Sequence, residues 1–228
     1  MSECAALLVS YGLIFLIIGF ASLLLSLKIV SPEISRKLIH IGVSNWWILA
    51  MFTMEHTLTA VIGPLSFILI NYLSYKLRLF PAMEDDAPHE NLGTIYFPVS
   101  LLVLVLLSYA GPMPLAAGAA GILVMGYGDG CAALIGKHFG KIRLSFRAFR
   151  TRKTILGTTT MLSISYLVIV VTALFLSPAG TTPTGANPWI WALPVAAAAA
   201  IVELFTPRGL DNITVPILTA LLYWAAPL

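Results

Sequence analysis

The sequence has few charged residues for its length. Only 10% of its 228 residues are Asp, Glu, Lys or Arg, whereas 59% are hydrophobic, and the mean hydropathy is +0.93. In a soluble domain about a quarter of the residues are charged. The composition therefore excludes an ordinary soluble domain and predicts an all-α, polytopic integral membrane protein.

Cysteine is scarce as well. Cys4 and Cys131 are far apart in the sequence, so nothing indicates a disulfide framework or a zinc site. The first apolar run, 5–27, is too long for the core of a secretory signal, and it lacks a basic segment before it and a small-residue cleavage pattern after it. We expect it to be a retained first helix.

Acidic residues are missing from a long central part of the chain. No Asp or Glu occurs from Gly130 to Val202. The segment 137–153 within it carries seven of the 13 Lys and Arg, interleaved with hydrophobic side chains. Such a segment is typical of a loop that lies on anionic lipid headgroups, and nucleotide binding is the alternative for its middle.

Apolar runs of about 20 residues are long enough to cross a bilayer. Breaks at Pro, Gly and charged residues define eight candidate spans: 5–27, 38–54, 58–79, 94–110, 114–136, 155–177, 188–205 and 212–227. The second is short and the last contains Pro216, so seven spans is the alternative count. We expect one membrane-embedded domain over residues 1–228.

The basic residues orient these spans, because loops rich in Lys and Arg stay in the cytoplasm. With eight spans and an N-terminus outside, the cytoplasmic loops are 28–37, 80–93, 137–154 and 206–211. All 13 Lys and Arg then lie at or near the cytoplasmic face, and both termini lie on the non-cytoplasmic side. Chemistry is therefore expected at the cytoplasmic face.

One carboxylate lies inside a predicted span. Asp129, Ala132, Gly136 and Gly140 are spaced i, i+3, i+7 and i+11, which is one narrow face of a helix. Small residues on such a face usually pack against another helix. A carboxylate inside an apolar span is costly and indicates a functional site, with a structural ion pair as the alternative.

A second polar group precedes the sixth span. Lys153 and Thr154 stand at its N-terminus, where backbone amides, the helix dipole and the ammonium group would converge on a phosphate. The predicted topology places this group and Asp129 at the same membrane face. We therefore expect an anion-binding site close to Asp129.

Further acidic residues flank the last loop. Glu203 ends the seventh span, and Asp211 with Asn212 opens the eighth. Asp211 or Asn212 could simply cap a helix, and Glu203 could pair with Arg208. Together with Asp129, however, these carboxylates offer the oxygen ligands that Mg²⁺ prefers, opposite cations suited to phosphates.

These elements together resemble the nucleotide-binding signature of the CTP-dependent polyprenol kinase family, which includes dolichol kinase, phytol kinase and a yeast-type diacylglycerol kinase. The central match is Asp129-x2-Ala132-x3-Gly136-x3-Gly140, then Arg152-Lys153-Thr154-x2-Gly157. Two outer elements match as well: Arg36-x3-His40 resembles the family's early element, and Glu203 with Asp211-Asn212 resembles its late acidic element. Without this resemblance, Arg36 and Lys37 would be a positive-inside flank and His40 a packing residue.

The resemblance implies a membrane lipid kinase that transfers the terminal phosphate of CTP to an isoprenoid alcohol such as phytol, geranylgeraniol, farnesol or a longer polyprenol. The implied catalytic residues are Asp129, Glu203, Asp211 and His40, and the three carboxylates would also bind Mg²⁺. The implied nucleotide-binding residues are Arg36, Ala132, Gly136, Gly140, Arg152, Lys153, Thr154, Gly157 and Asn212. The expected partners are the alcohol, the nucleotide and membrane lipid, without nucleic acid, and the small-residue runs could also pack between two chains as a homodimer.

Two departures keep alternatives open. Leu156 stands where the family often has an acidic residue, and the long gap from Gly140 to Lys153 resembles the related CDP-diacylglycerol synthases. A cytidylyltransferase that makes a CDP-lipid is therefore one alternative, although after Gly157 the only cation is Arg208 and no histidine follows. Diacylglycerol kinase is a second alternative. A lipid transporter is a third, but no internal repeat supports it.

Overall fold

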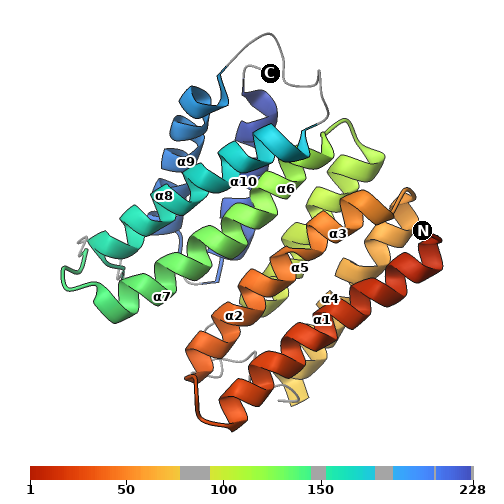
Figure 1. Cartoon of the computed structure of the whole chain (residues 1–228), viewed down its shortest axis with the longest axis horizontal. Coiled ribbons are helices and arrows are strands. Elements are labelled where there is room, and N and C mark those ends of the chain that lie inside the picture. Colours follow the sequence, from red (N-terminus) through yellow and green to blue (C-terminus); the bar gives the residue numbers. More distant parts are fainter. Residues whose placement is uncertain (78–92, 145–152, 178–186, 208, 227–228) are drawn as a thin grey trace.

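The chain forms a bundle of helices in the computed structural model (Figure 1). The structure describes residues 1–77, 93–144, 153–177, 187–207 and 209–226. The α-helices are α1 (Glu3–Ser26), α2 (Pro32–Ser44), α3 (Trp46–Thr53), α4 (Thr57–Leu77), α5 (Gly93–Val105), α6 (Leu115–Leu123), α7 (Gly130–Phe139), α8 (Ile155–Val171), α9 (Pro188–Phe205) and α10 (Asp211–Ala225). Three π-helical segments continue α5, α6 and α8: η2 (Leu106–Ala110), η3 (Val124–Asp129) and η4 (Thr172–Leu176). The prediction of an all-α fold is confirmed for the part of the chain that is described.

Each predicted span corresponds to a helix or to consecutive helices. Six helical segments are long and apolar enough to cross a membrane: Glu3–Ser26, Thr57–Leu77, Gly93–Ala110, Leu115–Phe139, Ile155–Leu176 and Pro188–Phe205. The other two predicted spans, 38–54 and 212–227, correspond to the α2–α3 pair and to α10, which has 15 residues. The described helices thus establish six candidate spans, and the count of eight stays a prediction.

Asn45 separates α2 from α3. Its side-chain amide donates hydrogen bonds to the carbonyls of Ile41 at 2.9 Å and Gly42 at 3.2 Å, so it satisfies acceptors that a continuous helix would pair with main-chain N–H groups. The hydroxyl of Tyr127 donates to Asn45 Oδ1 at 2.9 Å. A hydrogen bond therefore joins the break in the second predicted span to η3, which ends at Asp129.

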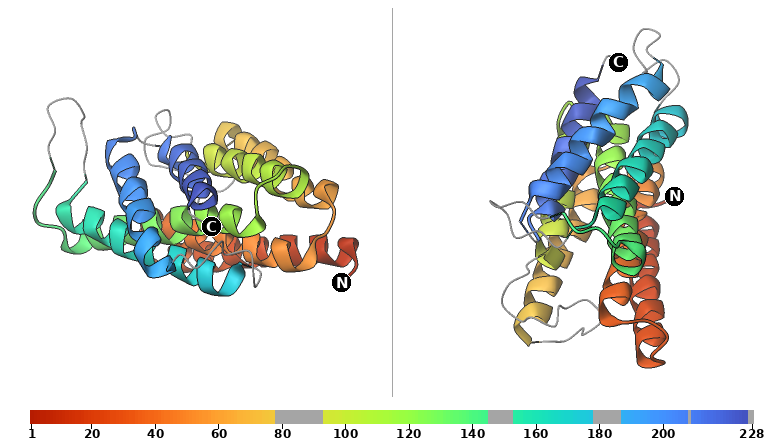
Figure 2. Two further views of the ribbon diagram at one scale, coloured as in Figure 1. Left: turned by 90° about the horizontal axis from the view of Figure 1, so that it is seen from above. Right: turned by 90° about the vertical axis from the view of Figure 1, so that its left-hand side faces the viewer.

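The helices form two layers, which are visible from above in the left view of Figure 2. One layer contains α1, α2, α6–α7 and α8, and the other contains α4, α5, α10 and α9. Successive predicted spans run in opposite directions (Figure 1). The end of α1 and the start of α2 therefore lie at the same end of the bundle as the end of α7 and the start of α8. Both termini lie toward the opposite end.

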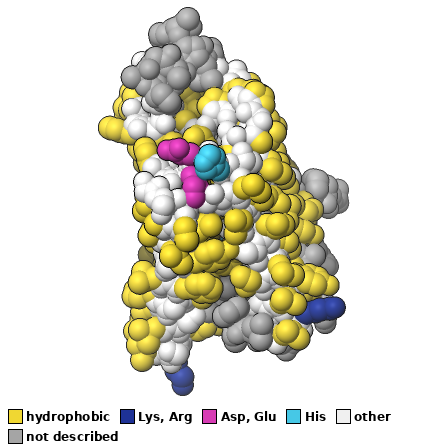
Figure 3. Space-filling view, turned by 90° about the vertical axis from the view of Figure 1, so that its right-hand side faces the viewer, with side chains coloured by type: hydrophobic (Ala, Val, Ile, Leu, Met, Phe, Trp, Pro, Cys, Tyr) yellow, Lys and Arg dark blue, Asp and Glu magenta, His cyan; other side chains and the backbone are white. Residues whose placement is uncertain are grey.

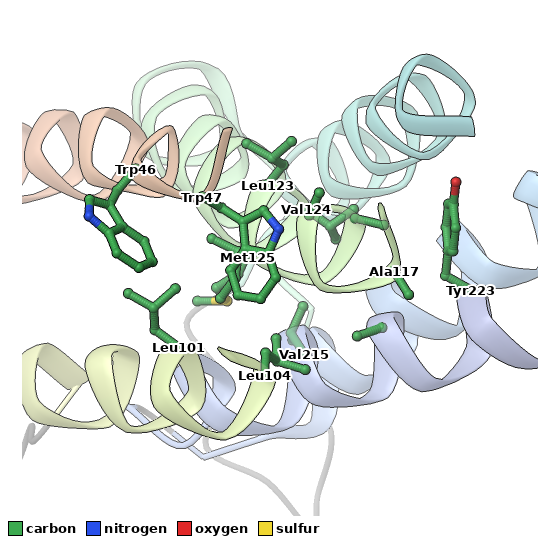
Figure 4. Close-up of a cluster of buried hydrophobic side chains, with 14 of the residues drawn as sticks. Trp46, Trp47, Leu101, Leu104, Ala117, Leu123, Val124, Met125, Val215 and Tyr223 are labelled. Atoms are coloured by element: carbon green, nitrogen blue, oxygen red, sulfur yellow. The ribbon is translucent and has the colours of Figure 1, made fainter. Parts of the chain in front are cut away.

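Small residues let the two layers approach closely around α6. Residues 116–123 are all buried. Gly118 faces Trp47, and Gly121 lies against the backbone of α10 at Pro216. Figure 4 shows Trp46, Trp47 and Met125 among the aliphatic side chains of this core. The small residues of α6 therefore pack within this chain.

The outer surface agrees with a membrane environment. The side shown in Figure 3 is mainly hydrophobic, with acidic and histidine side chains near one end and Lys or Arg side chains near the other. At the N-terminal end, Glu3 Oε1 accepts a hydrogen bond from the N–H of Glu55 at 2.9 Å. Lipid-facing helices are expected to show such an apolar band between two polar ends.

The contact between α6 and α10 can be tested with Gly121→Ala. The added Cβ would lie 3.0 Å from the Cβ of Ala220 and would also meet the Pro216 carbonyl. Overpacking of this kind costs about 1–3 kcal/mol, so we expect thermal unfolding in detergent at a lower temperature. Gly12→Ala is the matched control, because its Cβ would meet nothing within 4 Å. An equal loss of stability in both variants would contradict the packing argument.

Candidate functional site

The basic loop after α7 is closed by a short backbone pairing. The N–H of Leu144 donates to the carbonyl of Lys153 at 2.9 Å, and the N–H of Ile155 donates to the carbonyl of Ile142 at 3.0 Å. This pairing holds Lys153 at the start of α8. Arg152, a predicted nucleotide-binding residue, lies outside the described residues.

Thr154 caps α8. Its Oγ1 accepts the N–H of Gly157 at 3.0 Å and donates to the carbonyl of Gly136 at 3.3 Å, and the residue is buried. The N–H groups of Gly157 and Ile155 already have hydrogen-bond partners. An anion at this helix terminus would therefore interact with the helix dipole and with Lys153 instead of with these two amides.

The small residues of the predicted signature form the contact between α7 and α8. A Cβ on Gly136 would lie 2.9 Å from both Gly157 Cα and Thr154 Oγ1, and a Cβ on Gly157 would lie 3.1 Å from the Ala132 carbonyl. A Cβ on Gly140 would lie 2.5 Å from Thr154 Oγ1. Helix packing thus accounts for these residues, and their contact with a nucleotide stays a prediction.

Two buried ion pairs lie at this end of the bundle. Lys37 Nζ is 2.5 Å from Asp129 Oδ2, and Lys153 Nζ is 2.5 Å from Glu203 Oε1. Lys153 Nζ also donates to the main-chain carbonyl of Glu203. Both carboxylate side chains are 7% exposed. The pairs join α2 to η3, and the start of α8 to the end of α9.

Asp211 completes the group of carboxylates. It begins α10, and its Oδ1 accepts from both the backbone N–H and the side-chain amide of Asn212 at 3.1 Å. The Asn212 amide also donates to the carbonyl of Gly209 at 3.1 Å, which fixes the turn before α10. The charge of Asp211 interacts with those of Asp129 and both paired lysines. Three acidic and two basic side chains therefore share one electrostatic neighbourhood.

The early motif on α2 lies beside this cluster. The His40 ring meets the Phe97 ring at a centroid distance of 4.5 Å and an interplanar angle of 61°. The ring lies within electrostatic range of Lys37, Asp129 and Arg36. His40 thus lies near Asp129, and Arg36 precedes it by about one turn of α2.

The three predicted metal ligands have the donor chemistry for Mg²⁺, because they provide only carboxylate oxygens. Among the described residues, no three His, Cys, Asp or Glu side chains lie close enough together to hold a metal ion as they stand. Asp129 and Glu203 are instead paired with lysines. The residues fit Mg²⁺ in kind, and binding it requires the lysines to release these oxygens.

Two residues of this region were not identified from the sequence as site residues. Lys37 follows Arg36 at the start of a predicted span. In the sequence, a basic residue at such a position looks the same whether it flanks the membrane or pairs with a buried acidic residue. Only its contact with Asp129 separates these roles. Asn71 is a buried amide inside α4, and a polar side chain within an apolar span was the available signal.

Comparison with known proteins identifies similar sequences. The chain is 34% identical to a phytol kinase of Synechocystis sp. over 90% of this chain and 84% of that protein. It is 29% identical to a probable chloroplastic phytol kinase 1 of Oryza sativa over 97% of this chain and 73% of that protein. For a probable chloroplastic phytol kinase of Triticum aestivum the identity is 28%, over 95% and 75%. No family model and no solved structure matches the chain.

The buried pair on α2 can be tested with Lys37→Met. Removal of one partner leaves the Asp129 carboxylate buried without its counterion, which typically costs about 3–5 kcal/mol. We expect a marked loss of unfolding free energy in detergent, and partial recovery when Asp129→Asn is added.

The matched control is Lys137→Met. Lys137 of α7 pairs with Glu33, which like Lys37 lies on α2, but these side chains are 61% and 39% exposed. An exposed pair contributes at most about 1 kcal/mol. If Lys37→Met and Lys137→Met cost the same, the burial of the Lys37–Asp129 pair does not matter for stability.

Proposed function

Because the chain belongs to the phytol kinase family, within the CTP-dependent polyprenol kinases, we propose that it transfers the terminal phosphate of CTP to the hydroxyl of an isoprenoid alcohol. The observation that carries this proposal is the cluster in which the buried Asp129 and Glu203 pair with Lys37 and Lys153 beside Asp211. Phosphoryl transfer needs cations for the phosphates and carboxylates for a metal or a proton. The family implies CTP as the donor.

The phosphates would bind at the start of α8. Lys153 would leave Glu203 for a phosphate oxygen, and the dipole of α8 would favour the same anion. Lys37, on α2, would likewise leave Asp129 for a phosphate oxygen. Arg36 near the start of α2 and Asn212 at the start of α10 would complete the predicted phosphate contacts. In this arrangement each lysine exchanges one anionic partner for another, so that no buried charge is left unpaired.

Asp129, Glu203 and Asp211 would hold Mg²⁺ once the lysines have moved. Bound there, Mg²⁺ would neutralise the negative charge of the phosphate oxygens. Glu203 or Asp211 would accept the proton of the alcohol. The alcohol oxygen forms a bond to the terminal phosphorus, the bond from that phosphorus to the bridging oxygen breaks, and CDP leaves with its electron pair. The protein contributes mainly positioning and charge.

The proposed topology has eight spans, both termini on the non-cytoplasmic side and the site at the cytoplasmic face. The concentration of Lys and Arg in the predicted cytoplasmic loops and beside them supports it. We also propose that residues 1–228 act as a single catalytic domain. An alcohol from the bilayer would then meet a nucleotide from the cytoplasm at one surface.

The reaction can be tested with purified protein, phytol and CTP labelled at the terminal phosphate. We expect labelled phytyl phosphate and CDP. Asp129→Asn should lower turnover by at least about 100-fold, because one of the three proposed Mg²⁺ ligands is lost and the charge of the transferring phosphate is then poorly neutralised. Glu33→Gln is the matched control, since that carboxylate belongs to the exposed pair with Lys137. Release of pyrophosphate instead of CDP would indicate the cytidylyltransferase alternative and contradict the kinase.

The orientation can be tested by cysteine labelling in intact cells. Cys4 is exposed and unpaired, so a membrane-impermeant maleimide should label it from outside in a Cys131→Ser background. Lys137→Cys, at an exposed position near the proposed cytoplasmic end, should be labelled only after the membrane is permeabilised when Cys4 is also replaced by Ser. The reverse pattern would contradict the proposed orientation.

A further inference from the structure

Two buried polar atoms of α2 and α4 have no hydrogen-bond partner. They are Nε2 of His40 on α2 and Oδ1 of Asn71 on α4. Buried polar groups are nearly always satisfied in folded proteins, so each exception calls for an explanation. Neither atom takes part in the contacts that hold the Lys37–Asp129 pair.

The orientation of the Asn71 amide follows from its other contact. Its Nδ2 donates to the carbonyl of Thr94 at 2.7 Å, and the reverse orientation would place an oxygen against that carbonyl. Oδ1 is therefore the free atom, and the residue is only 6% exposed. A buried amide oxygen can only accept, so its ligand must donate a hydrogen.

Helix α5 contacts both residues. Thr94 receives the hydrogen bond of Asn71, and Phe97 packs against the ring of His40 at 4.5 Å. Thr94 and Phe97 are three residues apart, so they lie on the same face of α5. Asn71 of α4 and His40 of α2 thus both contact the first turns of α5.

An aromatic path leads from this region toward the membrane-facing surface. Phe67 lies one helical turn before Asn71 on α4. Its ring is 6.0 Å from that of Tyr11 and 6.3 Å from that of Phe15, and Phe15 is 50% exposed. The Tyr11 hydroxyl is already hydrogen-bonded to Ser66 at 2.6 Å, so the path presents apolar ring surface.

We propose that His40 and Asn71 bind the hydroxyl of the acceptor alcohol, with its hydrocarbon tail along Phe67 and Phe15. This inference rests on the proposed function and adds the acceptor site to it. The hydroxyl donates its hydrogen to Asn71 Oδ1, and its oxygen accepts a hydrogen bond from the N–H of His40 Nε2. A carboxylate has no hydrogen to donate, so the site selects an alcohol over the corresponding acid. Because Lys37, one turn before His40 on α2, contacts Asp129, the hydroxyl would lie beside the proposed phosphate site.

The test is equilibrium binding without nucleotide, measured with labelled phytol and with labelled phytane, the hydrocarbon that lacks the hydroxyl. In the wild-type protein phytol should bind more tightly than phytane. Asn71→Leu should weaken phytol binding about 10-fold, equivalent to about 1.4 kcal/mol, and leave phytane binding unchanged. In turnover assays the KM for phytol should rise while the KM for CTP stays the same.

His40→Phe is the second variant, because it keeps an aromatic ring against Phe97 and removes only the nitrogens. His40→Phe should also weaken the binding of phytol and leave the binding of phytane unchanged. Thr172→Val is the matched control, since it removes a different buried polar atom without a partner, the hydroxyl of Thr172 in η4. It should leave the affinities for phytol and phytane unchanged.

Equal weakening of phytol and phytane in both site variants would overturn the proposal, since it would mean a structural role. Unchanged phytol binding would overturn it too, since the hydroxyl would bind elsewhere. Binding is measured without nucleotide, so a preference for phytol that both variants abolish would support the acceptor site even if no phosphate were transferred. The proposed kinase function would then fail separately.

Discussion

The burial of acidic side chains in an apolar bundle is the constraint on which this structure depends. Asp129 and Glu203 lie within helical segments that are long and apolar enough to span a membrane, where an unpaired charge is very costly. Each is paired with a lysine at 2.5 Å. These pairs require α2 to lie against η3 and the start of α8 to lie against α9, so segments far apart in sequence converge at one end of the bundle.

This convergence also needs small residues. Gly126 and Gly130 leave room for side chains of α2, and Gly136 and Gly157 leave room for each other's backbone. The charged side chains can meet only where the helices that carry them approach closely. The charged cluster therefore depends on the same small residues as the helix packing. The π-helical turn that ends at Asp129 is the kind of irregularity often found at functional sites.

Helix α2 separates two chemically different regions. Lys37 reaches the carboxylates, and one turn later His40 meets Phe97 of α5. In the proposed mechanism the nucleotide would bind on the first side and the alcohol on the second. The short helix would then bring a water-soluble and a lipid-soluble substrate together, and the break at Asn45 would tie its far end to η3.

The sequence by itself determined the helical segments and the two ends of the charged cluster. Apolar runs and basic flanks depend on local composition, so the spans agree with the helices, and a carboxylate such as Asp129 inside an apolar run is conspicuous. Only the tertiary structure decided that Lys37 is its partner, that Gly136 and Gly157 form a helix contact, and that Asn71 and His40 both contact α5. Contacts between residues distant in sequence leave no local pattern, because they depend on which faces of the helices meet.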